Sequence, residues 1–133
     1  VRHTLGHMTR AVLEGVAFGL KDSFRLMEAA GLPAGQMQIR ASGGGVRSRL
    51  WQQILADVIG APLVTTSTTE GAAYGAALLA AVGAGIYPDV ASACAATIQT
   101  GEPAQPAQPE AYERPYEIYQ TLYPTLRETF MRL

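Results

Sequence analysis

The sequence predicts an α/β fold in which a few parallel strands are flanked by helices. Segments with helical periodicity alternate along the chain with two short segments that have the alternating pattern of strands. Strands that are separated by helices pair in parallel through right-handed crossover connections. The chain has 133 residues, of which 48% are hydrophobic, and this is enough apolar material for the packed core of one domain.

The first thirty residues carry the longest helical pattern. We expect a helix from His3 to Ala30, ended by the glycine and proline of residues 31–33. Its apolar side chains recur at spacings of three and four, which predicts a stripe facing the core. The stripe consists of Leu5, Met8, Val12, Leu13, Val16, Leu20, Phe24 and Met27.

Two strands and a second helix are expected in the middle of the chain. Residues 36–42 alternate between apolar and polar side chains and end at a glycine triplet, residues 43–45. The helix runs from about Ser48 to Ile59, and Gly60 and Pro62 end it. Its apolar side holds Leu50, Trp51, Ile54, Leu55 and Val58. The second strand covers residues 63–66, and residues 67–70 have the Ser-x-x-Glu spacing of a capping box that starts another helix.

The last part of the chain is predicted to be helical apart from one connector. Small residues dominate residues 71–81, so this helix can lie close against a sheet or a neighbouring helix, and a short helix follows at residues 88–96. Residues 100–111 form a proline-rich connector along the surface, and residues 112–133 form a closing amphipathic helix. Residues 1–99 are therefore the core. Two strands make a very small parallel sheet, which suggests a fragment of a larger domain.

Charge and cysteine content argue against several classes of partner. The chain has 10 Lys and Arg against 11 Asp and Glu, and it has no basic cluster, so we expect no nucleic-acid binding. The single cysteine, Cys94, cannot form an internal disulfide, which fits the cytoplasm, and we expect it to be a buried inert thiol. Residues 71–87 are weakly polar but broken by glycines and too short to span a bilayer, so no membrane segment is expected.

The most informative local feature is the strand-to-helix junction at residues 41–48. Three successive glycines let a ligand touch the backbone, and the free N–H groups at the start of the following helix favour an anion such as a nucleotide phosphate. The junction is neither a Walker A loop nor a dinucleotide fingerprint, because neither Gly-Lys-Ser/Thr nor G-x-G-x-x-G is present. A tight turn that binds no ligand explains the glycines equally well.

The titratable residues supply no nucleophile, general base or metal cage. His3 and His7 share one helix face but lack a third ligand. Glu14 could be a catalytic acid or base, although a carboxylate hydrogen-bonded to a neighbouring group is the more ordinary role in such a helix. Asp22 and Asp57 are expected to be exposed helix acids. We therefore predict no catalytic residue and no metal ligand within this chain.

Four segments, residues 7–18, 43–62, 70–80 and 116–130, together resemble the FGGY carbohydrate kinases. Residues 7–18, His-Met-x-x-Ala-Val-Leu-Glu-Gly-Val-Ala-Phe, resemble the downstream half of the second signature of that family, so the chain is expected to begin inside the signature. Residues 43–62 are similar, almost position for position, to the adenosine motif of the family. Residues 70–80 resemble the small-residue helix beside the nucleotide, in the form common among xylulose kinases, and residues 116–130 resemble the terminal helix of that subfamily.

The resemblance implies part of an actin-like ATPase domain of the ribonuclease H-like class, here the C-terminal, nucleotide-side portion of a two-domain sugar kinase. Such a kinase uses ATP and Mg²⁺ to phosphorylate a sugar, here a pentulose, D-xylulose to D-xylulose 5-phosphate. Glycerol, gluconate and ribulose kinases of the same family are alternatives. In the family the sugar pocket and the catalytic Asp lie upstream, so this chain is expected to be inactive alone. A noncatalytic interaction module, such as a homodimer contact, is the alternative from another class.

The resemblance also implies which residues contact ATP or ADP. The second glycine of the triplet, Gly44, is expected against the α-phosphate, with Gly43 and Gly45 shaping the turn. Ser48 is expected near the adenine, where several relatives have Asn, and Arg47 is expected to reach either the nucleotide or solvent.

Overall fold

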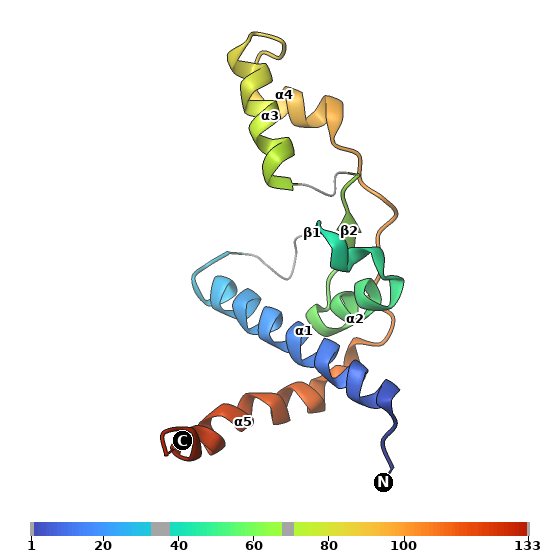
Figure 1. The fold of residues 1–133 in the computed structure, drawn as a ribbon, viewed down its shortest axis with the longest axis vertical. Helices are drawn as coiled ribbons and strands as arrows, with labels where there is room; N and C mark the ends of the chain where they lie inside the picture. The colour runs from blue at the N-terminus through green and yellow to red at the C-terminus, as the bar shows by residue number, and fades with distance from the viewer. Residues whose placement is uncertain (1, 33–37, 68–70, 133) are drawn as a thin grey trace.

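The computed structural model describes residues 2–32, 38–67 and 71–132. Five α-helices and two strands follow one another in the described ranges (Figure 1), with one short 3-10 helix before α2 and another before α5. The elements are α1 (Leu5–Ala29), β1 (Ile39–Ala41), η2 (Gly44–Arg47), α2 (Arg49–Ile59), β2 (Leu63–Thr65), α3 (Gly71–Gly83), α4 (Val90–Thr97), η3 (Pro109–Tyr112) and α5 (Glu113–Phe130).

The two strands pair in parallel, as the alternation of elements predicts. Ile39 lies opposite Leu63 and Ala41 lies opposite Thr65, with α2 as the crossover between the strands. The first strand is shorter than its sequence pattern, because β1 covers only three residues. Residues 36 and 37 of that pattern lie outside the described residues. So does the expected capping box at residues 67–70, apart from residue 67.

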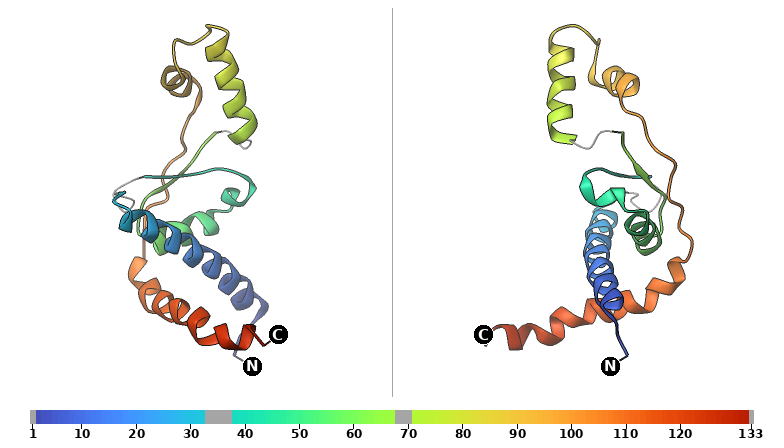
Figure 2. Two further views of the ribbon diagram at one scale, coloured as in Figure 1. Left: turned by 90° about the vertical axis from the view of Figure 1, so that its left-hand side faces the viewer. Right: turned by 45° about the vertical axis from the view of Figure 1, so that its right-hand side comes forward.

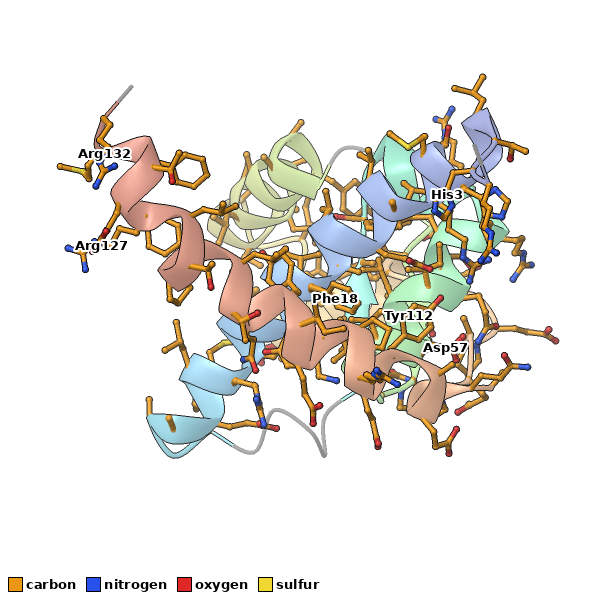
Figure 3. All side chains as sticks on the ribbon, turned by 90° about the horizontal axis from the view of Figure 1, so that it is seen from below. His3, Phe18, Asp57, Tyr112, Arg127 and Arg132 are labelled. Atoms are coloured by element: carbon orange, nitrogen blue, oxygen red, sulfur yellow. The ribbon has the colours of Figure 1, made fainter. Side chains whose placement is uncertain are left out.

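The core lies where α1, α2 and the start of α5 meet β2. Phe18 of α1 is buried beside Tyr112, with ring centroids 6.2 Å apart (Figure 3), and beside Tyr116, at 5.6 Å. Tyr112 and Tyr116 therefore belong to the core, whereas Tyr123, further along the closing helix, is 67% exposed. The buried cluster consists of Ala17, Phe18, Ile54, Leu55, Ala56, Val58, Leu63, Tyr112 and Tyr116.

Most side chains of the α1 stripe are exposed, so the prediction that they face the core is wrong for them. Ala17 is fully buried, whereas Val12, one of the stripe residues, is 66% exposed. Periodicity identifies an apolar side of a helix but not the element that covers it. In the described residues α2 and α5 cover a different side of α1, the one that holds Ala17 and Phe18. The exposed stripe residues are Leu5, Met8, Val12, Val16, Leu20 and Met27.

Asp22 is not the exposed helix acid that was expected. Its Oδ1 accepts a hydrogen bond of 2.5 Å from the hydroxyl of Tyr116, so this bond joins α1 to α5. Burial is the main cause of the raised pKa of the Tyr116 hydroxyl, and the hydrogen bond to the Asp22 carboxylate is the second cause. The Nζ of Lys21 lies 4.8 Å from the centroid of the same ring, so the face of the tyrosine carries a cation.

The helices α3 and α4 pack on each other and stand apart from the sheet, at the upper end of the molecule in Figure 1. Leu78 and Ala93 are their buried residues, and the hydroxyl of Tyr74 donates to the carbonyl of Thr97 at 3.4 Å. The small-residue helix is therefore confirmed and packs on a neighbouring helix, but most of its Gly and Ala residues are exposed. In the described ranges, no helix combines the length and apolarity needed to cross a membrane.

The proline-rich connector is more ordered than the expected surface loop, because part of it pairs with the edge of β2. Leu63 and Ala104 exchange two backbone hydrogen bonds of 3.0 and 2.8 Å, and the N–H of Gly101 donates to the carbonyl of Thr65 at 2.9 Å. Figure 2 shows this segment running beside β2. Proline has no N–H to donate, and here the paired residue lies between two prolines, Pro103 and Pro106.

Candidate functional site

The glycine turn leaves β1 with a backbone that favours glycine. Gly43 has a φ of 99°, a conformation that side chains with a Cβ rarely adopt. The triplet was expected to lead straight into a helix, but the single turn of η2 intervenes before α2 begins at Arg49. The physical reason is Ser48, whose extended backbone, with a ψ of 115°, ends η2 and makes the chain start a new helix.

Ser48 is the N-cap of α2. Its Oγ accepts a hydrogen bond of 3.3 Å from the N–H of Trp51. A serine hydroxyl has one O–H donor besides its acceptor lone pairs, so capping leaves that donor for another partner. Gly60 closes the same helix in the left-handed conformation, with a φ of 80°, as its sequence position predicts.

The three glycines have different surroundings. A Cβ built on Gly43 or Gly44 would meet no heavy atom within 4 Å, whereas a Cβ on Gly45 would lie 3.6 Å from Nε1 of Trp51. Gly44 therefore presents open backbone, Gly43 is required for its positive φ, and Gly45 lies against an aromatic ring. Trp51 packs on the core cluster, which confirms its expected packing role.

A buried amide that the sequence did not single out fixes the turn to α2. Gln52 is only 6% exposed, and its Nε2 donates to the carbonyl of Val46 at 2.5 Å. The contact joins η2, which holds Val46, to the first turn of α2. Glutamine in a helix normally faces solvent, so its spacing alone carries no signal for this contact.

A hollow of about 350 Å³ opens beside the turn. It takes residues from the glycine turn, the first turns of α2, the end of β2 and the connector. Of the residues expected to contact the nucleotide, Gly43 and Arg47 line the hollow. Gly44, Gly45 and Ser48 do not. The carboxyl ends of parallel strands meet at one edge of a sheet, so the residues after β2 could have been found from the sequence, but those of the connector could not. The lining consists of Gly43, Val46, Arg47, Arg49, Gln52, Thr65, Thr66, Gly101 and Glu102.

The other candidate groups have structural partners. The Nδ1 of His7 accepts from the N–H of Thr4 at 3.1 Å, at the start of α1. Glu14 accepts a hydrogen bond from Nε of Arg10 at 2.8 Å. This bond is the largest of the contributions that raise the pKa of Arg10. Cys94 is only partly buried, so the expected buried position of this residue is not what the structure shows. Among residues 2–32, 38–67 and 71–132, no three His, Cys, Asp or Glu side chains gather closely enough to hold a metal.

Comparison with known proteins gives matches over almost the whole chain. Residues 1–84 match the model of the C-terminal domain of the FGGY family of carbohydrate kinases. A xylulose kinase of Staphylococcus epidermidis is 35% identical over 124 residues, covering 92% of this chain and 25% of the relative. A glycerol kinase of Citrifermentans bemidjiense is 40% identical over 84 residues, covering 62% of this chain and 17% of the relative.

A solved structure shows the same fold. The crystal structure of xylulose kinase from Rhodospirillum rubrum superposes with a TM-score of 0.82 at 34% identity, covering 98% of this chain and 27% of that chain. The chain thus spans about a quarter of the length of the xylulose kinases it matches. Its small parallel sheet with flanking helices is part of the actin-like ATPase fold of these kinases. The family match, the relatives and the fold agree, and the chain belongs to the FGGY family of carbohydrate kinases.

Proposed function

We propose that this chain forms the adenosine side of the ATP site in a kinase that phosphorylates a pentulose, D-xylulose to D-xylulose 5-phosphate. The observation that supports the substrate is the extent of similarity: the xylulose kinase match extends over 92% of the chain, through the connector and into α5, whereas the glycerol kinase match covers 62%. The observation that supports the site is the open backbone of the glycine turn.

In this proposal the phosphate end of the nucleotide lies against Gly44. The open space around this residue lets a phosphate oxygen approach the backbone, and the positive φ of Gly43 turns the chain toward that space. Gly45 packs against the ring of Trp51, which holds the turn in place. Any side chain at position 44 would occupy the volume that the phosphate needs.

Ser48 and Arg47 complete the proposed contacts. The O–H of Ser48, which capping leaves available, donates to a ring nitrogen of the adenine. Arg47 is exposed at the hollow beside the turn, where its guanidinium can lie near the phosphates or extend into solvent.

The chain alone is proposed to be inactive. Phosphoryl transfer needs a bound sugar, a group that accepts the proton from its hydroxyl, and closure of a cleft around both substrates. When bound, Mg²⁺ neutralises charge on the ATP phosphates. We assign no Mg²⁺ ligand to this chain. An ATP-dependent metabolic kinase with one unpaired cysteine fits the cytoplasm.

The substitution Gly44→Val tests the proposed phosphate contact. Position 44 is exposed, so the variant should fold normally, yet its affinity for ADP should fall at least about tenfold, which corresponds to about 1.4 kcal/mol. Gly15→Ala is the matched control, because position 15 also has open space and lies far along the chain from the turn. Isothermal titration with ADP measures both. Normal ADP affinity in a folded Gly44→Val protein would refute the proposed contact.

Glycerol is a second candidate substrate, favoured by the 40% identity to the glycerol kinase. The residues that choose the sugar are expected outside this chain, so the test is made on the complete kinase. Comparison of kcat/KM for D-xylulose and glycerol decides between the two: a higher value for glycerol would contradict the pentulose assignment.

A further inference from the structure

One buried carboxylate controls the course of the connector. Asp57, expected from the sequence to be an exposed helix acid, is only 7% exposed. Its Oδ1 accepts hydrogen bonds from the N–H groups of Ala107 at 2.5 Å and Gln108 at 3.0 Å, and from Nε2 of Gln53 at 3.0 Å. Three donors on one carboxylate oxygen, two of them backbone N–H groups of the connector, make this a firm attachment.

Gln53 strengthens the same attachment. Its Nε2 also donates to the carbonyl of Gln105 at 2.9 Å, so one side chain of α2 holds both the carboxylate of Asp57 and the connector. The connector is thereby tied to α2 at residues 105–108 and to β2 at Gly101 and Ala104.

At its β2 end, where Gly101 is tied to Thr65, the connector contributes to the hollow beside the glycine turn. Gly101 and Glu102 line it together with Gly43 and Arg47. Gly101 lies so close to β2 that an added Cβ would be 3.0 Å from Oγ1 of Thr65. The wall that these two residues form therefore depends on the connector staying against the sheet.

We propose that Asp57 is a positioning residue for the nucleotide site, because it holds the connector so that Gly101 and Glu102 complete the hollow beside Gly43. This inference rests on the proposed function. It adds residues 101 and 102, which follow the glycine turn by more than fifty positions, to the surroundings of the nucleotide. It also gives a role to a helix residue that is not itself part of the hollow.

Two substitutions at position 57 separate the positioning role from general stability. Asp57→Ala removes the acceptor, so the amides of Gly101 and Ala104 should exchange with solvent at least about tenfold faster. The affinity for ADP should fall about tenfold. The ADP-induced amide shifts of Gly101 and Glu102 should disappear, while those of the glycine turn remain. Asp57→Asn keeps an acceptor oxygen and should restore the shifts and most of the affinity.

Asp22→Ala is the matched control, because it also removes a hydrogen-bonded carboxylate, but one that holds α5 rather than the connector. It should leave the connector amides and the ADP affinity unchanged. If Asp57→Ala unfolds the chain, Gly101→Ala serves instead: its Cβ would crowd Oγ1 of Thr65 at 3.0 Å, which should press the connector away from β2 and cause the same loss of affinity and shifts.

The outcomes distinguish this inference from the function on which it rests. Absence of any ADP-induced shift in the folded parent chain would overturn both. Shifts at the glycine turn without shifts at Gly101 and Glu102 would overturn the positioning role alone, and so would a folded Asp57→Ala variant with unchanged ADP affinity.

Discussion

Nη2 of Arg10 donates a hydrogen bond of 2.7 Å to the hydroxyl of Tyr112, which lies 102 residues further along the chain. The same guanidinium donates through Nε to Glu14 at 2.8 Å. Tyr112 is buried at the end of the connector, where its ring meets Phe18. This contact therefore joins the first helix to the point where the connector becomes α5.

Removal of that hydroxyl should destabilise the chain. Tyr112→Phe keeps the buried ring but loses the hydrogen bond from Arg10, and we expect the free energy of unfolding to fall by about 1 kcal/mol. Urea denaturation measures the change. Tyr123→Phe is the control, because Tyr123 is 67% exposed and should have no measurable effect. Equal stability of Tyr112→Phe and the parent chain would mean that the hydrogen bond contributes nothing.

The cap on α2 gives a second expectation. Ser48→Ala removes the acceptor for the N–H of Trp51 and should lower the free energy of unfolding by about 1 kcal/mol. Ser48→Asn should restore it, because asparagine caps helices as well as serine does. Thermal unfolding followed by circular dichroism compares the three proteins. The capping role would be rejected if alanine and asparagine gave the same midpoint.

The two sides of α1 should respond differently to a polar side chain. Val12→Gln should change the free energy of unfolding by less than about 0.5 kcal/mol, because Val12 is 66% exposed. Ala17→Gln should destabilise by more than about 2 kcal/mol, since Ala17 is fully buried and has no room for a longer polar side chain. Urea denaturation of both variants tests the burial of the helix, and equal effects would contradict it.

Asp89 gives the helix α4 a dependence on pH. Its Oδ1 accepts from the N–H of Ser92 at 2.7 Å, and this hydrogen bond lowers the pKa of the carboxyl. A carboxyl with a lowered folded-state pKa stabilises the fold fully above its unfolded-state pKa of about 3.9, and the contribution is lost as the pH falls through the folded value.

The matched variant is Asp89→Asn, which caps the helix without a titrating charge. Thermal midpoints measured at about pH 6 and about pH 3 should show a larger decrease for the parent chain than for the variant. Identical decreases would exclude a contribution of Asp89 to the acid sensitivity.

Local pattern was enough to predict the helices, the parallel pairing and the glycine turn. The left-handed end of α2 at Gly60 follows from residue type and position. The packing of Trp51 also follows, because it shares a helix side with Ile54 and Leu55.

The residues that sequence reasoning misplaced depend on contacts between distant segments. Asp57 is buried and accepts hydrogen bonds from residues 107 and 108, which fold back onto α2 about fifty residues later. Val12 is exposed because the described residues place no element over its side of α1. Leu50 was expected on the apolar side of α2, but it is also exposed. Periodicity reports the polarity of a helix side, and the tertiary partner decides whether that side is buried.

The most direct test of the central claim is a titration of this chain with ADP, followed by the amide shift of each residue. The account predicts that shifts concentrate at residues 43–48, with a second group at Gly101 and Glu102. It also predicts that Gly44→Val abolishes both groups. Shifts spread evenly over the surface, or no shift at millimolar ADP in a folded chain, would contradict the assignment of the glycine turn to the nucleotide.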